Sequence, residues 1–165
     1  MMGKSAVFIL PNPAETSGPN TTPRILHRWF LASYARNGWF GWSPSPSSPN
    51  GEPASSYQNE TQVEHPALSP VLADAVCEAV FPKATDLPPR DLLLGTVAGM
   101  AAMSIPRHGP GVKPVPREHP PERLLPGSVN VSFFDGHAQS VALESLWQLY
   151  WHRDYQSPAK RPGLK

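Results

Sequence analysis

The sequence predicts an α+β domain built on a small, mostly antiparallel sheet with β-hairpins, short helices and long proline-rich loops. Proline supplies 22 of the 165 residues, and because proline fixes φ and lacks a backbone donor, it limits long helices and central strands. Two dipeptides typical of tight hairpins, Asn37-Gly38 and Asp135-Gly136, lie between apolar runs. A stretch with helical apolar spacing follows the second dipeptide.

The length of the chain suits one domain with a modest core. We expect that domain to span residues 1–156, with a flexible, exposed loop at about 43–56, a proline-rich segment at about 106–126 and a polar, frayed tail at 157–165. The net charge is +1, so the charge balance predicts no nucleic-acid partner and no anionic membrane surface. No apolar run is long enough to cross a membrane. The single cysteine, Cys77, is expected to be a small buried thiol.

In the first quarter of the chain, residues 5–10 predict a strand and residues 11–23 predict a loop rich in turn formers. Residues 24–34 fit either a helix or the first arm of a hairpin. We favour the hairpin, which would turn at Asn37-Gly38 and return along residues 39–42.

The middle of the chain gives weaker signals. Residues 61–66 predict a short extended segment, and the apolar positions of residues 69–81 fit either strand alternation or a helix. Residues 83–91 are expected to be irregular, and residues 92–103 are ambiguous between helix and strand. Residues 105–126 predict a long loop that carries proline, glycine and histidine.

The C-terminal third predicts a hairpin around a two-residue type I′ turn at Asp135-Gly136. That turn would set three cross-strand pairs: Phe134 with His137, Phe133 with Ala138, and Val131 with Ser140. One face would then hold large residues opposite small ones, namely Val129, Val131 and Phe133 opposite Ala138, Ser140 and Ala142. A helical apolar face follows, formed by Leu143, Leu146, Trp147 and Tyr150.

The sharpest candidate for chemistry is a cluster of His108, Asp135 and His137. Histidine and aspartate together ligate zinc or move protons, so this cluster is consistent with a metal-dependent hydrolase, with His119 or His152 as a further ligand. The alternative, which we favour, is turn chemistry, in which the aspartate accepts amide hydrogen bonds and the glycine supplies positive φ. No metal or other cofactor is therefore predicted.

The tryptophans offer a second candidate, a carbohydrate-binding module that uses Trp39, Trp42 and Trp151. The alternative, again favoured, is that they build the core of a small domain, since each aromatic ring buries a large area.

Several stretches of the chain resemble one bacterial family. Arg107-His108-Gly109 and then residues 125–137, LPGSVNVSFFDGH, resemble the prepilin-type processing-associated H-X9-DG motif of pilin-like secreted proteins. Residues 146–152, LWQLYWH, and residues 158–163 look like the C-terminal end of one branch of that family. Residues 33–39 are similar to its S-Y-x-x-N-G-W segment. The residues that carry the resemblance in the C-terminal part are His108, Asn130, Phe134, Asp135, Gly136, His137, Trp147 and Trp151.

The chain departs from the family pattern in two places. His108 and Asp135 are separated by 26 residues where the motif has nine, and a proline-rich insertion fills the difference. The long apolar helix that anchors family members at their N-terminus has no counterpart in these 165 residues. We therefore expect the C-terminal globular portion of such a protein, as a truncated form or as a domain that has lost its anchor.

The resemblance implies a structural or interaction role and no enzymatic activity. It implies a pilin-like head domain of a pseudopilin-like protein related to type II secretion and type IV pili, located in the cell envelope or outside the cell. The implied partners are other pilin-like subunits or envelope proteins. In that architecture the sheet packs on the anchoring helix, so one apolar face of this sheet should be exposed or covered by residues 92–103.

Overall fold

The computed structural model describes residues 33–40, 55–109 and 114–165, and every structural statement below refers to these residues. The expected strand at 5–10, the loop at 11–23 and most of the loop at 43–56 lie outside them.

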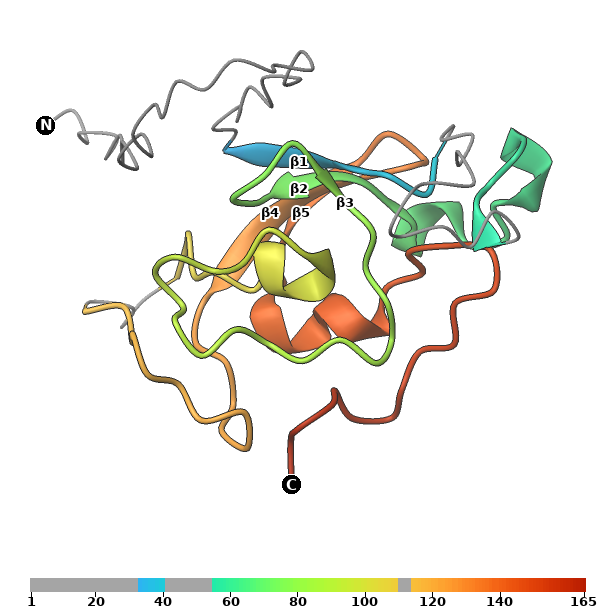
Figure 1. Ribbon diagram of the computed structural model, residues 1–165. Coiled ribbons are helices and arrows are strands. Elements are labelled where there is room, and N and C mark those ends of the chain that lie inside the picture. The colour runs from blue at the N-terminus through green and yellow to red at the C-terminus, as the bar shows by residue number, and fades with distance from the viewer. Residues whose placement is uncertain (1–32, 41–54, 110–113) are drawn as a thin grey trace, which may run out of the picture.

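The described chain forms one mixed sheet with the strand order β3-β1-β2-β4-β5 (Figure 1). The strands are β1 (Tyr34–Asn37), β2 (Pro70–Asp74), β3 (Ala79–Val80), β4 (Ser128–Phe133) and β5 (Ala138–Ala142). Short 3₁₀ helices complete the fold: η2 (Glu60–Gln62), η3 (Pro66–Leu68), η4 (Gly99–Ala102) and η5 (Leu143–Gln148). All strand pairs are antiparallel except β1 with β3. The predicted α+β class with a mostly antiparallel sheet is confirmed.

The core lies between the sheet and the helices η4 and η5, which cover the same face (Figure 1). Strand β4 alternates strictly, and its inward side chains Val129, Val131 and Phe133 are at most 2% exposed. Met100 and Met103 come from the ambiguous stretch 92–103 and are fully buried in the same cluster. That stretch therefore covers the apolar face of the sheet, as one of the two expectations had it.

Asp135-Gly136 lies at the tip of the β4–β5 hairpin, as predicted, but the turn is of another type. Ser132 pairs with Ala138, and the Phe133 amide donates to the His137 carbonyl at 2.9 Å, so three residues form the loop. Gly136 has φ +91° and its amide donates to the Phe133 carbonyl, while no non-glycine residue described has positive φ. This is a type I turn followed by a glycine bulge, which spares the aspartate the positive φ of a type I′ turn.

The extra loop residue shifts the predicted register by one. Val141 lies opposite Val129 and both are buried, whereas the predicted partners of the apolar β4 residues face the solvent. Those exposed residues are Ala138, Ser140 and Ala142. All three predicted pairs are therefore wrong, because a one-residue slip moves side chains to the opposite face: Phe134 with His137, Phe133 with Ala138, and Val131 with Ser140.

The hairpin predicted at Asn37-Gly38 is also wrong. Strand β1 has β2 on one side and β3 on the other, so neither edge of β1 is left for a return strand. Of the predicted return strand, residues 41 and 42 lie outside the described residues. The Gly38 amide donates to the Val80 carbonyl at 2.7 Å. A Cβ on Gly38 would lie 2.4 Å from the Phe81 ring, so the glycine permits a close contact. The Phe40 amide closes a turn on the Asn37 carbonyl at 3.3 Å, but this turn does not lead into a hairpin.

Other segments divide between agreement and correction. Residues 69–81 form β2 and β3, which settles their ambiguity in favour of strands. Residues 61–66 form no strand, since η2 and η3 occupy half of these positions and the rest are irregular. Cys77 is only half-buried, and burial raises the pKa of its thiol. No helix in the described residues has the length and apolar character needed to cross a membrane.

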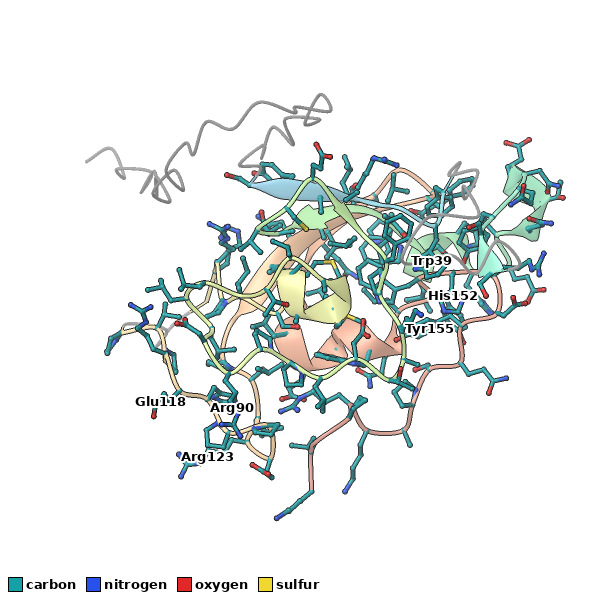
Figure 2. All side chains as sticks on the ribbon, viewed as in Figure 1. Trp39, Arg90, Glu118, Arg123, His152 and Tyr155 are labelled. Atoms are coloured by element: carbon teal, nitrogen blue, oxygen red, sulfur yellow. The ribbon has the colours of Figure 1, made fainter. Side chains whose placement is uncertain are left out.

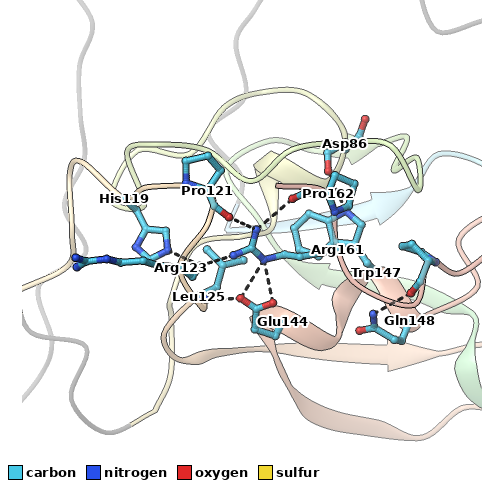
Figure 3. Close-up of polar contacts among 11 residues, drawn as sticks. Asp86, His119, Pro121, Arg123, Leu125, Glu144, Trp147, Gln148, Arg161 and Pro162 are labelled. Carbon is cyan, nitrogen blue, oxygen red and sulfur yellow. Dashed lines mark hydrogen bonds and ion pairs between the residues drawn. The ribbon is translucent and has the colours of Figure 1, made fainter. Parts of the chain in front are cut away.

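The tail at 157–165 is not frayed at its centre. Arg161 is 2% exposed, and its guanidinium pairs with Glu144 of η5 at 2.9 Å. It also donates to the carbonyls of Pro121 and Arg123 in the proline-rich loop (Figure 3). The tail and the loop are thus joined to η5 through one buried cation.

Candidate functional site

The motif residues lie at the two ends of β4. At the first end, His108 Nε2 is 2.9 Å from Asp74 Oδ2, and the same oxygen accepts the Asn130 amide at 2.7 Å. The Asn130 side-chain nitrogen lies 3.0 Å from His108 Nε2. The Asp74 side chain is 7% exposed and that of His108 46%. The Asp74 carboxylate therefore links the end of β2 to β4 and to His108 in the first part of the proline-rich loop.

His108 also pairs with the first residue of β4. Its amide and carbonyl exchange hydrogen bonds with Ser128 at 3.0 and 2.9 Å. As a result Gly109 and Gly127, the residues on either side of the intervening loop, come into contact. A Cβ on Gly109 would lie 3.2 Å from the Gly127 Cα, so these backbones pack as closely as glycine allows.

At the other end of β4, the hairpin tip holds the second pair of motif residues. His137 Nδ1 is 2.6 Å from Asp135 Oδ1, which also accepts the His137 amide at 3.2 Å. The hydrogen bond from the His137 ring, followed by the one from its amide, lowers the pKa of the Asp135 carboxyl. Both side chains are exposed, so the turn presents a carboxylate and an imidazole to solvent.

This pairing predicts a titration result. The Asp135 carboxyl should titrate below its ordinary pKa of 3.8, and His137→Ala should raise its pKa toward that value. A depressed pKa means that the interaction stabilises the fold at higher pH and is lost as the pH falls through the folded-state value. Carboxyl carbon chemical shifts measured from pH 2 to 6 check this; an Asp135 titration unchanged by His137→Ala would contradict it.

Aromatic side chains surround the tip. The Phe134 ring stacks on Phe40 at 5.4 Å, and Phe40 stacks on Tyr57 at 4.5 Å. On the other side of the strand, the His137 ring lies parallel to Phe133 at 4.4 Å. Phe134 is 37% exposed, so the stack extends from the core to the surface beside the turn.

The structure does not bring the proposed metal ligands together. His108 lies beside Ser128 at the start of β4, and Asp135 and His137 lie beyond its last residue, Phe133. A six-residue strand spans roughly 17 Å, which is far beyond the reach of one coordination sphere. No group of three or more potential ligands gathers anywhere in the described parts of the chain. The site composed of His108, Asp135 and His137 is therefore wrong.

The two histidines considered as further ligands are also apart from this cluster. His119 Nε2 lies 3.1 Å from the Arg123 carbonyl in the proline-rich loop. His152 packs between Trp39 and Tyr155, with ring centroids 4.9 and 5.1 Å away (Figure 2). The sequence could not place either residue, because each lies in a segment without a periodic signal.

Burial also excludes the sugar-binding platform that combined Trp39, Trp42 and Trp151. Trp39 is 2% exposed and Trp151 1%, and their indole nitrogens donate to the carbonyls of Pro82 and Leu146. Trp42 lies outside the described residues. Trp147 is likewise fully buried and donates to the Asp86 carbonyl. The three tryptophans in the described residues are core residues, as the favoured alternative predicted.

Two recesses in the described surface do not gather the side chains of a metal-binding site. One of about 70 Å³, between Tyr57, His65 and Tyr150, is well below the size of ordinary ligand pockets. Another, of about 450 Å³, opens over Arg90, Glu118 and Glu122 on the loops far from the hairpin tip (Figure 2).

Two of the buried polar groups, Asn37 and the Arg161–Glu144 pair, were not predicted from the sequence. Asn37 is 3% exposed and its side-chain nitrogen donates to the carbonyls of Pro70 and Trp151 at 2.9 and 2.8 Å. The second group is the Arg161–Glu144 pair (Figure 3). The only local signal for Asn37 was its place after an alternating run, which resembled a turn; Arg161 gave none.

Comparisons of the chain with known protein families, with curated proteins and with solved structures find no match.

Proposed function

We propose that this chain is the non-catalytic head domain of a pseudopilin-like envelope protein, in which a long loop interrupts the H-X9-DG motif. The observation that carries the proposal is the contact between Gly109 and Gly127. It offers a physical reason why 26 residues, and not nine, separate His108 from Asp135.

The contact between Gly109 and Gly127 shows where an inserted loop would begin and end. Residues 109–134 separate His108 from Asp135, a stretch of 26 residues. The loop 110–126 has 17 of them, and without it Gly109 would be followed directly by residues 127–134. Nine residues would then separate the histidine from the Asp-Gly, as in the motif. Because His108 and Ser128 already pair across the junction, such an excision requires no rearrangement of the strand.

The use of the polar residues supports a structural role. Asp74, Asn37 and the Arg161–Glu144 pair all bond to backbone groups that hold segments of the domain together. The hairpin tip is an exposed part of the motif, where Phe134, Asp135 and His137 face solvent. We infer that the tip contacts neighbouring pilin-like subunits or other envelope proteins.

The test is fractionation of the source cells with an antibody raised against this domain. We expect the native protein in the envelope or extracellular fraction, and cross-links from a photoreactive residue at position 134 to a pilin-like subunit. The same probe at the exposed Thr96, whose amide donates to the Ala101 carbonyl of η4, is the control. Confinement of the protein to the cytosolic fraction would contradict the proposal.

A further inference from the structure

Among the described residues, strand β5 is an open edge of the sheet, and the strand itself carries none of the usual protection. The opposite edge is β3, which has only two residues. Strand β5 has five, AQSVA, without a proline or a charged side chain. Natural edge strands usually carry a lysine, a proline or a bulge, or are covered, because unpaired backbone groups recruit another strand.

The register shows which backbone groups are unpaired. Hydrogen bonds join Phe133 to His137 and Leu143 to Gly127 at the two ends of the β4–β5 ladder. In an antiparallel ladder the bonded pairs alternate, so Gln139 and Val141 direct their amides and carbonyls to β4. The amides and carbonyls of the alternate residues in β5 point away from β4, toward the open edge. These residues are Ala138, Ser140 and Ala142, and none has a backbone partner on this side among the described residues.

We propose that this edge pairs with the β5 edge of a second copy of the chain, antiparallel about a two-fold axis at Ser140. The three outward residues form a palindrome, so Ala138 would lie opposite Ala142 of the other copy and Ser140 opposite its own equivalent. Each pair exchanges two backbone hydrogen bonds. A two-fold axis requires a self-complementary patch, and this strand meets that requirement.

The side chains favour a second copy over an unrelated strand. All three outward residues are exposed and small, so the two edges approach without a steric clash. No charge is placed opposite a like charge, because the strand has none. The interface is short, so we expect weak, concentration-dependent dimerisation, with Kd roughly in the micromolar to millimolar range. The proposal rests on the β5 edge alone, and its failure would leave the proposed function intact.

The test uses the full-length chain in sedimentation equilibrium from about 10 µM to about 1 mM. The wild-type protein should approach twice its 18.0 kDa mass as the concentration rises. Ser140→Lys and Ser140→Glu each place like charges opposite one another across the axis and should weaken dimerisation about five- to tenfold. Thr96→Lys adds the same charge on the far side of the sheet, beside η4, and should have no effect.

The decisive arm mixes the two Ser140 variants in equal amounts. The opposite charges should restore association as a heterodimer, which a misfolded variant cannot do. A wild-type monomer at every concentration would overturn the proposal and leave the edge to an extended segment of another protein. A dimer that the Ser140 variants do not weaken would overturn it, as would variants that fail to associate when mixed.

Discussion

Arg161→Ala is expected to destabilise the domain by about 3–5 kcal/mol, because it leaves a partly buried carboxylate without its partner. The Arg161 side chain is fully buried, and its Nε donates to both carboxylate oxygens of Glu144 at 2.9 Å. It also donates to the carbonyls of Pro121 and Arg123, and the guanidinium lies 5.9 Å from the Trp147 ring. The truncation removes all of these interactions at once.

The control for this prediction is Arg153→Ala. Arg153 pairs with Asp154 at 3.3 Å, but both side chains are exposed, so the loss should be below about 1 kcal/mol. Urea unfolding of both variants gives the two free energies. If Arg161→Ala cost no more than Arg153→Ala, the tail would not be part of the folded unit.

The second large effect is expected at Asn37. Asn37→Ala should cost about 2–4 kcal/mol, since it strips hydrogen bonds from the buried carbonyls of Pro70 and Trp151. Its side-chain oxygen also accepts the Trp39 amide at 3.1 Å. Asn37→Asp keeps the side-chain volume but replaces the donor with an acceptor, so it should be at least as destabilising.

Asn59→Ala is the matched control for Asn37. The Asn59 side chain is exposed and accepts a hydrogen bond from Thr61, so its loss should change stability by less than about 1 kcal/mol. Thermal unfolding of the three variants measures the differences. Equal melting temperatures for Asn37→Ala and Asn59→Ala would show that Asn37 does not hold β1 to β2 and the C-terminal segment.

Local signals predicted much of the fold. The proline content and the Asp135-Gly136 dipeptide act within a few residues, and they led to the correct class and the correct hairpin. These local signals could not predict the register of the hairpin, because Asp-Gly suits both a type I′ turn and a type I turn with a glycine bulge. Only the latter leaves Asp135 with an ordinary φ, and the apolar β4 partners then include Val141.

The buried polar groups could not be predicted for a different reason. Arg161 interacts with Glu144, Pro121 and Arg123, which are between 17 and 40 residues away in sequence. A polar tail gives no sign of such partners and resembles a solvated end. The metal hypothesis failed for a related reason: His108 pairs with Asp74, which lies 34 residues before it, and not with the aspartate of the hairpin.

The proposed kinship with the H-X9-DG family depends on the distance between Gly109 and Gly127, which can be measured in solution. In a uniformly labelled sample, we expect a strong nuclear Overhauser effect between their α-protons, together with slowly exchanging amides at His108 and Ser128. Absence of that contact, with rapid exchange at both amides, would remove the junction on which the restored motif spacing depends and would contradict the proposed kinship.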